Sequence, residues 1–137
     1  MNIVRLIIMM LIIGSIFLMS RNWIKSKDEP SIFDVPKKLQ DNKMSLKVYP
    51  FARTGGAEVY STSHSGGEDD RLYLEPATAY LAVTPENFTR MRDSGYALKL
   101  YGAFYVGKGI PARFLGMQPR PDKYSVFRYE SMDVVKE

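Results

Sequence analysis

The sequence predicts an N-terminal transmembrane helix plus a small mainly-β (α+β) domain, folded as a partly open barrel or a rolled antiparallel sheet with one short helix. Residues 3–19 are almost entirely apolar, and residues 44–137 alternate apolar and polar side chains in short runs. A single helix signal, at residues 84–95, interrupts these runs. We therefore divide the chain into a transmembrane anchor (1–24), a polar tether (25–43) and a β-rich globular domain (44–137).

The composition is that of a folded, cysteine-free protein. Hydrophobic residues make up 45% and charged residues 25% of the chain, which excludes wholesale disorder. The absence of cysteine excludes disulfides, thiolate nucleophiles and Cys-ligated zinc. Residues 45–137 hold 12 Lys/Arg and 11 Asp/Glu, so most of the net charge of +4 belongs to the anchor and tether. A nearly neutral domain disfavours nucleic acid as a partner.

The apolar run "IVRLIIMMLIIGSIFLM" is long enough to cross a bilayer. Extended to residue 24, it forms a helix of about 33 Å, against a hydrocarbon core of about 30 Å. Arg5 lies near its start and can reach the headgroups, while Arg21, Trp23 and Lys25 have the basic and aromatic character of a membrane interface. A cleaved signal peptide is the alternative, but no small-x-small site closes the run before Arg21. We expect a retained, single-pass signal anchor.

Two features of the sequence give opposite predictions for the side of the membrane on which the domain lies. Basic residues are more numerous after the apolar run than before it, which under the positive-inside rule keeps the domain in the cytoplasm. A short N-terminal tail followed at once by an apolar helix is instead the usual way to deliver a domain across a membrane. We expect the extracytoplasmic (periplasmic) side of a cell envelope, with the lipid bilayer and a protein as partners. The sequence leaves the oligomeric state open.

The tether mixes charges and prolines with a few apolar residues, which is linker composition. Ile32, Phe33 and Val35 interrupt its polar character. We favour a local contact of these residues with the domain or the lipid surface over the alternative, a short docking motif for a partner.

Within the globular domain, alternating runs predict the strands and capping residues predict the helix. Four runs precede the helix and two clear runs follow it: "SLKVYPF", "AEVYST", "RLYLE", "ATAYLAV", then "YALKLYGAFYVGKG" and "YSVFRYE". Thr84 can cap the helix, Pro85 suits its first position, and Gly95 can close it. After the last run, we expect the C-terminal end of the chain to be polar. An OB-type barrel has its helix in a similar place, and this likeness is one of element order alone.

A set of tyrosines occupies the strand phase opposite to the aliphatic residues. We predict a binding face from these tyrosines and one lysine: Tyr49, Tyr60, Tyr73, Tyr101, Tyr105 and Lys99. Tyrosine offers a large amphipathic surface and is enriched at interfaces, and beside a cation it also stacks on sugars or bases. Tyrosine also favours strands without binding anything. The hypothesis therefore requires at least three of the five rings on one exposed surface.

No motif predicts catalysis, a metal site or a cofactor. His64, the single histidine, lies in "STSHSGGEDD" beside Ser63 and Ser65, an arrangement that rarely gives a nucleophile and its base. With the acids at 68–70 its spacing matches neither a zinc helix nor a calcium loop. "GKGIPA" lacks a full phosphate loop, and the sequon "NFT" falls in the predicted helix. An enzyme is the third hypothesis, and a concave pocket in which His64 is hydrogen-bonded to an acid would support it.

The sequence thus predicts a membrane-anchored domain that binds a protein, or serves as an accessory subunit of an envelope complex. The alternative is an OB-like barrel that binds a glycan or an oligonucleotide.

Overall fold

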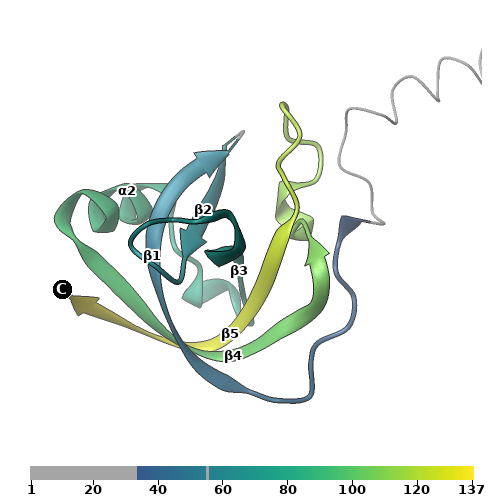
Figure 1. The fold of residues 1–137 in the computed structure, drawn as a ribbon, viewed down its shortest axis with the longest axis horizontal. Coiled ribbons are helices and arrows are strands. Elements are labelled where there is room, and N and C mark those ends of the chain that lie inside the picture. Colours follow the sequence, from purple (N-terminus) through teal and green to yellow (C-terminus); the bar gives the residue numbers. More distant parts are fainter. Residues whose placement is uncertain (1–33, 55) are drawn as a thin grey trace, which may run out of the picture.

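Five strands form a closed barrel in the order β1-β2-β3-β5-β4 (Figure 1). The computed structural model describes residues 34–54 and 56–137. The strands are β1 (Met44–Thr54), β2 (Ala57–Ser61), β3 (Arg71–Pro76), β4 (Tyr96–Gly109) and β5 (Tyr124–Lys136). The helices are α2 (Pro85–Ser94) and the 3-10 turns η2 (Glu68–Asp70), η3 (Ala79–Leu81) and η4 (Ala112–Phe114). The prediction of a mainly-β domain with one short α-helix is confirmed.

Strand pairing closes the barrel between β3 and β5, which are parallel. β1 pairs antiparallel with β2 on one side and with β4 on the other. β4 and β5 pair along nearly their whole lengths, with register shifts that let the two long strands coil around the core. The prediction of a strand over "ATAYLAV" is wrong, because the chain leaves the sheet at Pro76 and makes the turn η3. In this turn the Leu81 N–H donates to the Thr78 carbonyl at 3.1 Å.

The helix α2 has the boundaries that its sequence predicts. The Thr84 hydroxyl accepts a hydrogen bond from the Asn87 N–H at 3.2 Å, and Pro85 takes the first helical position. Gly95 ends the helix at φ +71°, a left-handed conformation that glycine adopts without strain. Phe88 is fully buried, and its ring meets the edge of Tyr60 at a centroid distance of 5.2 Å. The helix thereby closes one end of the barrel.

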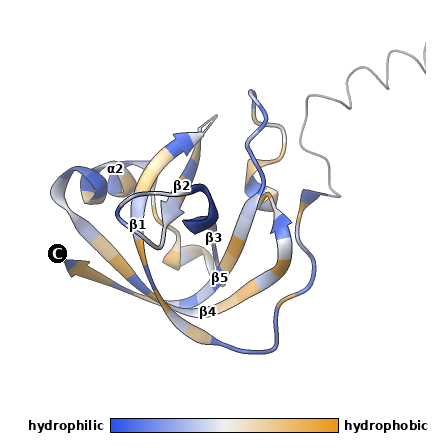
Figure 2. Ribbon diagram, in the orientation of Figure 1, coloured by the Kyte–Doolittle hydropathy of each residue, from blue (hydrophilic) through white to orange (hydrophobic). Residues whose placement is uncertain are grey.

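Two apolar cores lie on the two sides of the sheet. The first fills the barrel and contains Val48, Tyr60, Leu72, Leu74, Phe88, Met91, Leu98, Leu100, Phe127 and Tyr129. The second lies between the outer surface of the barrel and the β4–β5 loop, and contains Ala57, Val59, Tyr73, Tyr105, Ile110, Phe114, Tyr124 and Val126. Figure 2 shows apolar residues alternating with polar ones along β4 and β5, strands that contribute to both cores. Burial on both sides of the sheet explains why so many tyrosines are enclosed.

The predicted anchor (1–24) and residues 25–33 of the tether lie outside the described residues. Across 34–54 and 56–137, no helix combines the length and the hydropathy needed to cross a bilayer. The described part of the tether is bound to β4 rather than free of the domain. The Ile110 N–H donates to the Asp34 carbonyl at 2.9 Å, and the Val106 N–H donates to the Lys38 carbonyl at 2.7 Å. Leu39 packs on the second core.

Candidate functional site

The five candidate tyrosines do not share one exposed surface. Tyr60 is 2% exposed and faces the barrel interior, because Ala57 and Val59 of the same strand take the outer side. Tyr73 and Tyr105 do face outward, as their strand phase predicts, but they are 0% and 9% exposed. The expected tyrosine face is therefore not formed.

Tyr73 and Tyr105 are covered by segments that fold back over the barrel. The rings of Phe114 and Tyr124 lie 5.5 and 5.4 Å from the Tyr73 ring, and the Tyr73 hydroxyl donates to the Asp122 carbonyl at 2.5 Å. The Tyr105 hydroxyl donates to Glu75 Oε1 at 2.5 Å. Burial, with that hydrogen bond, raises the pKa of Tyr105 to about 12. These phenols stabilise the fold and are not presented to a partner.

The remaining candidates lie on the outer side of β1 and β4. Tyr101 is 43% exposed and Lys99 is exposed, whereas Tyr49 is half-buried under His64 at a centroid distance of 4.0 Å. Lys99 lies directly opposite Lys47 of β1. Of the five candidate tyrosines, Tyr101 alone therefore offers an exposed ring. The predicted membrane-interface residues Arg5, Arg21, Trp23 and Lys25 lie outside the described residues.

His64 does not occupy a concave pocket. Its Nε2 atom lies 3.5 Å from Glu137 Oε2, but the side chain is 73% exposed. The neighbouring Ser63 hydroxyl donates to Asp70 Oδ2 at 2.8 Å. His64 is not among the residues that line the cavities described below.

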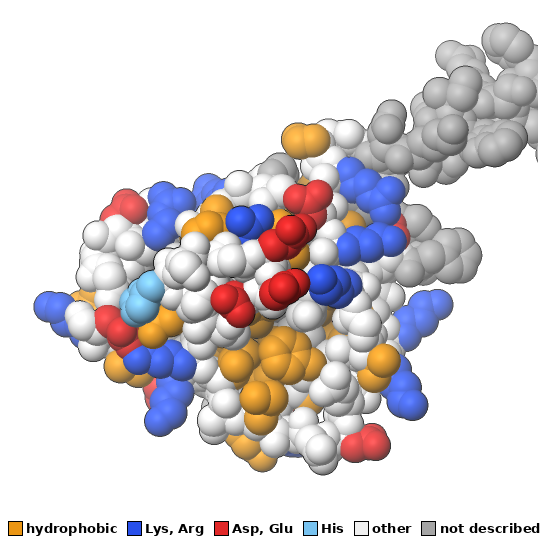
Figure 3. Space-filling model, in the orientation of Figure 1, with side chains coloured by type: hydrophobic (Ala, Val, Ile, Leu, Met, Phe, Trp, Pro, Cys, Tyr) orange, Lys and Arg blue, Asp and Glu red, His pale blue; other side chains and the backbone are white. Residues whose placement is uncertain are grey.

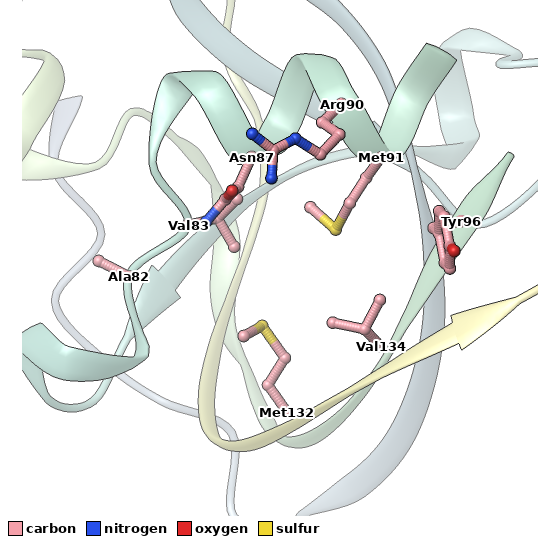
Figure 4. A pocket seen from close by; sticks show the side chains of 8 residues that line it. All are labelled: Ala82, Val83, Asn87, Arg90, Met91, Tyr96, Met132 and Val134. Carbon is pink, nitrogen blue, oxygen red and sulfur yellow. The ribbon is translucent and has the colours of Figure 1, made fainter. Parts of the chain in front are cut away.

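Among the described residues, a groove of about 350 Å³ lies between α2 and the C-terminal half of β5 (Figure 4). We name it the α2–β5 groove. It is lined by Ala82, Val83, Asn87, Arg90, Met91, Tyr96, Met132 and Val134. Met91 projects from the helix, and Met132 and Val134 project from the strand on the opposite side of the groove (Figure 4). Six of its eight lining residues are apolar or aromatic, with Asn87 and Arg90 as the polar groups.

The sequence did not predict this groove, because the last strand was expected only over residues 124–130. β5 continues to Lys136, and its inward residues Met132 and Val134 pair with Leu100 and Leu98 of β4. The signal was present as alternation, since Met132 and Val134 are separated by the polar Asp133. With three apolar residues among polar neighbours, two of them adjacent, the segment resembles a polar tail.

One edge of β5 is open beside the groove. β3 pairs with β5 only between Ser125 and Tyr129, whereas β4 pairs with β5 as far as Lys136. Among the described residues, no strand pairs with the other edge of residues 131–136. Val134 is 54% exposed at this edge. The backbone N–H and C=O groups along this edge therefore border the apolar groove, where a segment of another protein can pair with them.

A second cavity, at the barrel mouth, is much smaller. It measures about 100 Å³ and includes Glu58, Arg113 and Tyr129 in its lining. The Tyr129 hydroxyl donates to the Leu81 carbonyl at 2.6 Å. Burial lowers the pKa of Arg113, and the negative charge of Glu58 opposes this shift. Ligand pockets usually exceed about 300 Å³. A hollow of about 340 Å³ beside Lys47 and Lys99 also reaches this volume, but only two of its five lining residues are apolar. The α2–β5 groove has the more apolar lining and is the better candidate site.

Comparison of the chain with protein-family models, curated proteins and solved structures finds no match.

Proposed function

We propose that the protein is a single-pass membrane-anchored domain that captures an extended segment of a partner protein, as an adaptor or accessory subunit of an envelope complex. The observation that carries this proposal is the open edge of β5 along the α2–β5 groove. A peptide strand added to such an edge gains main-chain hydrogen bonds, while pockets beside the edge select its side chains.

The groove lining indicates the chemistry of the captured segment. Alternate side chains of an added strand would point toward Met91, Met132 and Val134, so they should be apolar. Methionine has three rotatable bonds and adapts to differently shaped apolar partners. Arg90 lines the helix side of the groove and favours a carboxylate in the segment. The partner segment is thus extended, alternately apolar and at least singly acidic.

The position of the groove fits an N-terminal anchor. Figure 1 shows α2 and the C-terminus on the side of the barrel away from the point where the described chain begins at residue 34. An anchor preceding residue 34 would join the barrel on the side away from the groove. A partner in the same compartment could then reach it without contacting lipid.

The alternative is glycan or oligonucleotide binding by an OB-like barrel. The barrel resembles OB folds in its five strands and in the helix before β4, and OB ligands bind on strands 2 and 3 and on the adjoining loops. Here the corresponding outer surface carries Tyr73, which Phe114 and Tyr124 cover. The covered surface supports protein capture in the groove over ligand binding on the barrel.

Site-specific photocrosslinking in native membranes tests the proposed function. Val134 and Val106 are both 54% exposed, but only Val134 lines the groove. A benzoylphenylalanine at position 134 should give one dominant adduct with another protein, and the same probe at position 106 should not. An adduct between position 134 and the protein's own residues 1–33, or a second copy, would overturn partner capture.

Binding of the crosslinked segment as a synthetic peptide to the full chain in nanodiscs then tests the mode of capture. Val134→Arg should weaken affinity at least about tenfold, because it places a charge against Met91 and Met132. Val106→Arg should leave affinity unchanged. N-methylation of alternate peptide amides should abolish binding if main-chain hydrogen bonds to β5 hold the segment. Full binding by the N-methylated peptide would contradict strand addition.

A further inference from the structure

Five basic side chains gather where residues 34–38 join the barrel. They come from the described tether, from the end of β4 and from the β4–β5 loop: Lys37, Lys38, Lys108, Arg120 and Lys123. All five residues are exposed. We name them the junction patch.

The contacts of Asp34 hold these segments together as one body. The Asp34 side chain is 9% exposed. Its carboxylate accepts a hydrogen bond from the Arg120 guanidinium at 2.8 Å and lies 2.7 Å from the Lys123 ammonium. The backbone of the same residue binds Ile110, and Gly109 is packed against Pro36. The tether and the loop therefore present their cations from a fixed position.

The charge of the described residues is separated between this patch and the rest of the surface. Segments 34–38 and 107–123 contain, besides the five patch cations and Arg113, only the acids Asp34 and Asp122. All other described residues, with Arg113, hold 10 Lys/Arg and 11 Asp/Glu. Figure 3 shows blue side chains gathered on the side where the described chain begins in Figure 1. A nearly neutral domain thus has one basic end.

We propose that the junction patch lies against anionic lipid headgroups and orients the barrel with the α2–β5 groove away from the bilayer. The inference rests on the membrane anchorage in the proposed function, and the sequence supplies its context. The apolar run 3–19 is followed by Arg21, Lys25 and Lys27 before the patch begins. Each Lys or Arg near an anionic membrane surface raises the equilibrium constant for membrane binding roughly fivefold. Asp34 offsets part of the charge of Arg120 and Lys123, so the patch attracts less strongly than five separate cations would. Because the chain itself holds the barrel beside the membrane, this attraction is sufficient to choose an orientation.

The cysteine-free chain permits a direct measurement of this orientation. Val106→Cys lies near Lys108 and Val134→Cys lies in the groove, and the two native valines are equally exposed at 54%. Each single cysteine carries a bimane fluorophore in the full chain, reconstituted into nanodiscs with nitroxide-labelled headgroups. In discs containing phosphatidylglycerol, quenching at position 106 should exceed that at position 134 at least about fivefold.

Charge-neutralised variants distinguish quenching that depends on the junction patch from quenching that arises only because an anchor holds the domain near the bilayer. Lys37→Gln, Lys38→Gln and Lys108→Gln together should reduce quenching at position 106 at least about threefold, as should discs of phosphatidylcholine alone. Arg92→Gln, Lys99→Gln and Lys136→Gln together remove the same charge from exposed positions elsewhere and should leave quenching unchanged.

Equal quenching at the two positions, or no dependence on lipid charge, would overturn the inference. Protection of position 106 by a DNA oligonucleotide in neutral discs would also overturn it, by assigning the patch to nucleic acid. Extraction of the full chain from vesicles by alkaline carbonate reports separately on anchorage. A chain that is retained but not quenched at position 106 refutes the patch alone, whereas a chain that is extracted refutes the anchor.

Discussion

Gly102 lies on the inner face of β4, at a register shift between β4 and β5. Its partner across the ladder is Tyr129, and a Cβ atom added at Gly102 would collide with the Arg128 carbonyl oxygen. Because the obstacle is backbone, the two strands would have to separate. We expect Gly102→Ala to lower the free energy of unfolding by about 3 kcal/mol, measured by urea denaturation. Gly67→Ala, whose new methyl meets only Asp70 at an ordinary distance of 3.6 Å, is the control.

The buried phenols make stability depend on pH in the alkaline range. Burial raises the pKa of Tyr129 and of Tyr105 to about 12, against an ordinary value of about 10. The folded protein then keeps protons that the unfolded chain releases, so this contribution is complete below pH of about 10 and is lost as the pH rises through 12. We expect the free energy of unfolding to fall across this window.

Phenolate absorbance, followed together with circular dichroism, checks this pH dependence. Tyr129→Phe should make the fall shallower, and Tyr101→Phe, at an exposed position, should leave its slope unchanged. Stability that stays constant across the same pH range would contradict the assignment.

At the scale of elements, α2 carries the helix side of the groove, and its cap holds it in place. Thr84→Ala removes the hydrogen bond to the Asn87 N–H and should cost about 1 kcal/mol of stability. Thr78→Ala is a matched control, because Thr78 precedes η3 without a side-chain cap bond. Urea denaturation measures both. If peptide capture uses the groove, Thr84→Ala should also weaken capture, whereas equal stability of the two variants would show that the cap is not needed.

The elements that the sequence predicts well are those with an unambiguous local signal. β4 has a long alternation whose aliphatic phase does face the core, and α2 has Thr84, Pro85 and Gly95 at the expected positions. β2 is different, because "AEVYS" has large apolar side chains in both phases and is buried on both sides. The rule that aliphatic residues face inward then places Tyr60 on the wrong side.

The candidate site was less predictable, since it depends on segments that meet only in three dimensions. Tyr73 and Tyr105 have the predicted phase, but their coverage comes from the β4–β5 loop, from Leu39 and from Glu75, which no local pattern connects to them. The basic end of the domain was hidden for the same reason. Its lysines and arginines come from two segments about 70 residues apart, and counting charge along the chain averages them with the acids between.

At the scale of the whole molecule, the β4–β5 loop joins two cores into one unit. Phe114 is 2% exposed and packs against Tyr73 on the outside of the barrel. We expect Phe114→Ala to lower the free energy of unfolding by about 3 kcal/mol, from lost burial and the cavity left behind. Leu115→Ala, at a residue that is 37% exposed, should cost less than about 1 kcal/mol. A loss confined to loop protection in hydrogen exchange, without global destabilisation, would show that the second core is dispensable.

β4 runs without interruption from Tyr96, which lines the groove, to Gly109, which packs against the described tether. Its 14 residues have a contour length of about 43 Å at roughly 3.3 Å per residue, and coiling around the barrel shortens the straight distance. If the junction patch lies on the headgroups, the barrel would act as a rigid spacer that sets the distance between the bilayer and the α2–β5 groove. Only proteins whose recognition segment stands a few tens of ångströms above the same bilayer could engage it.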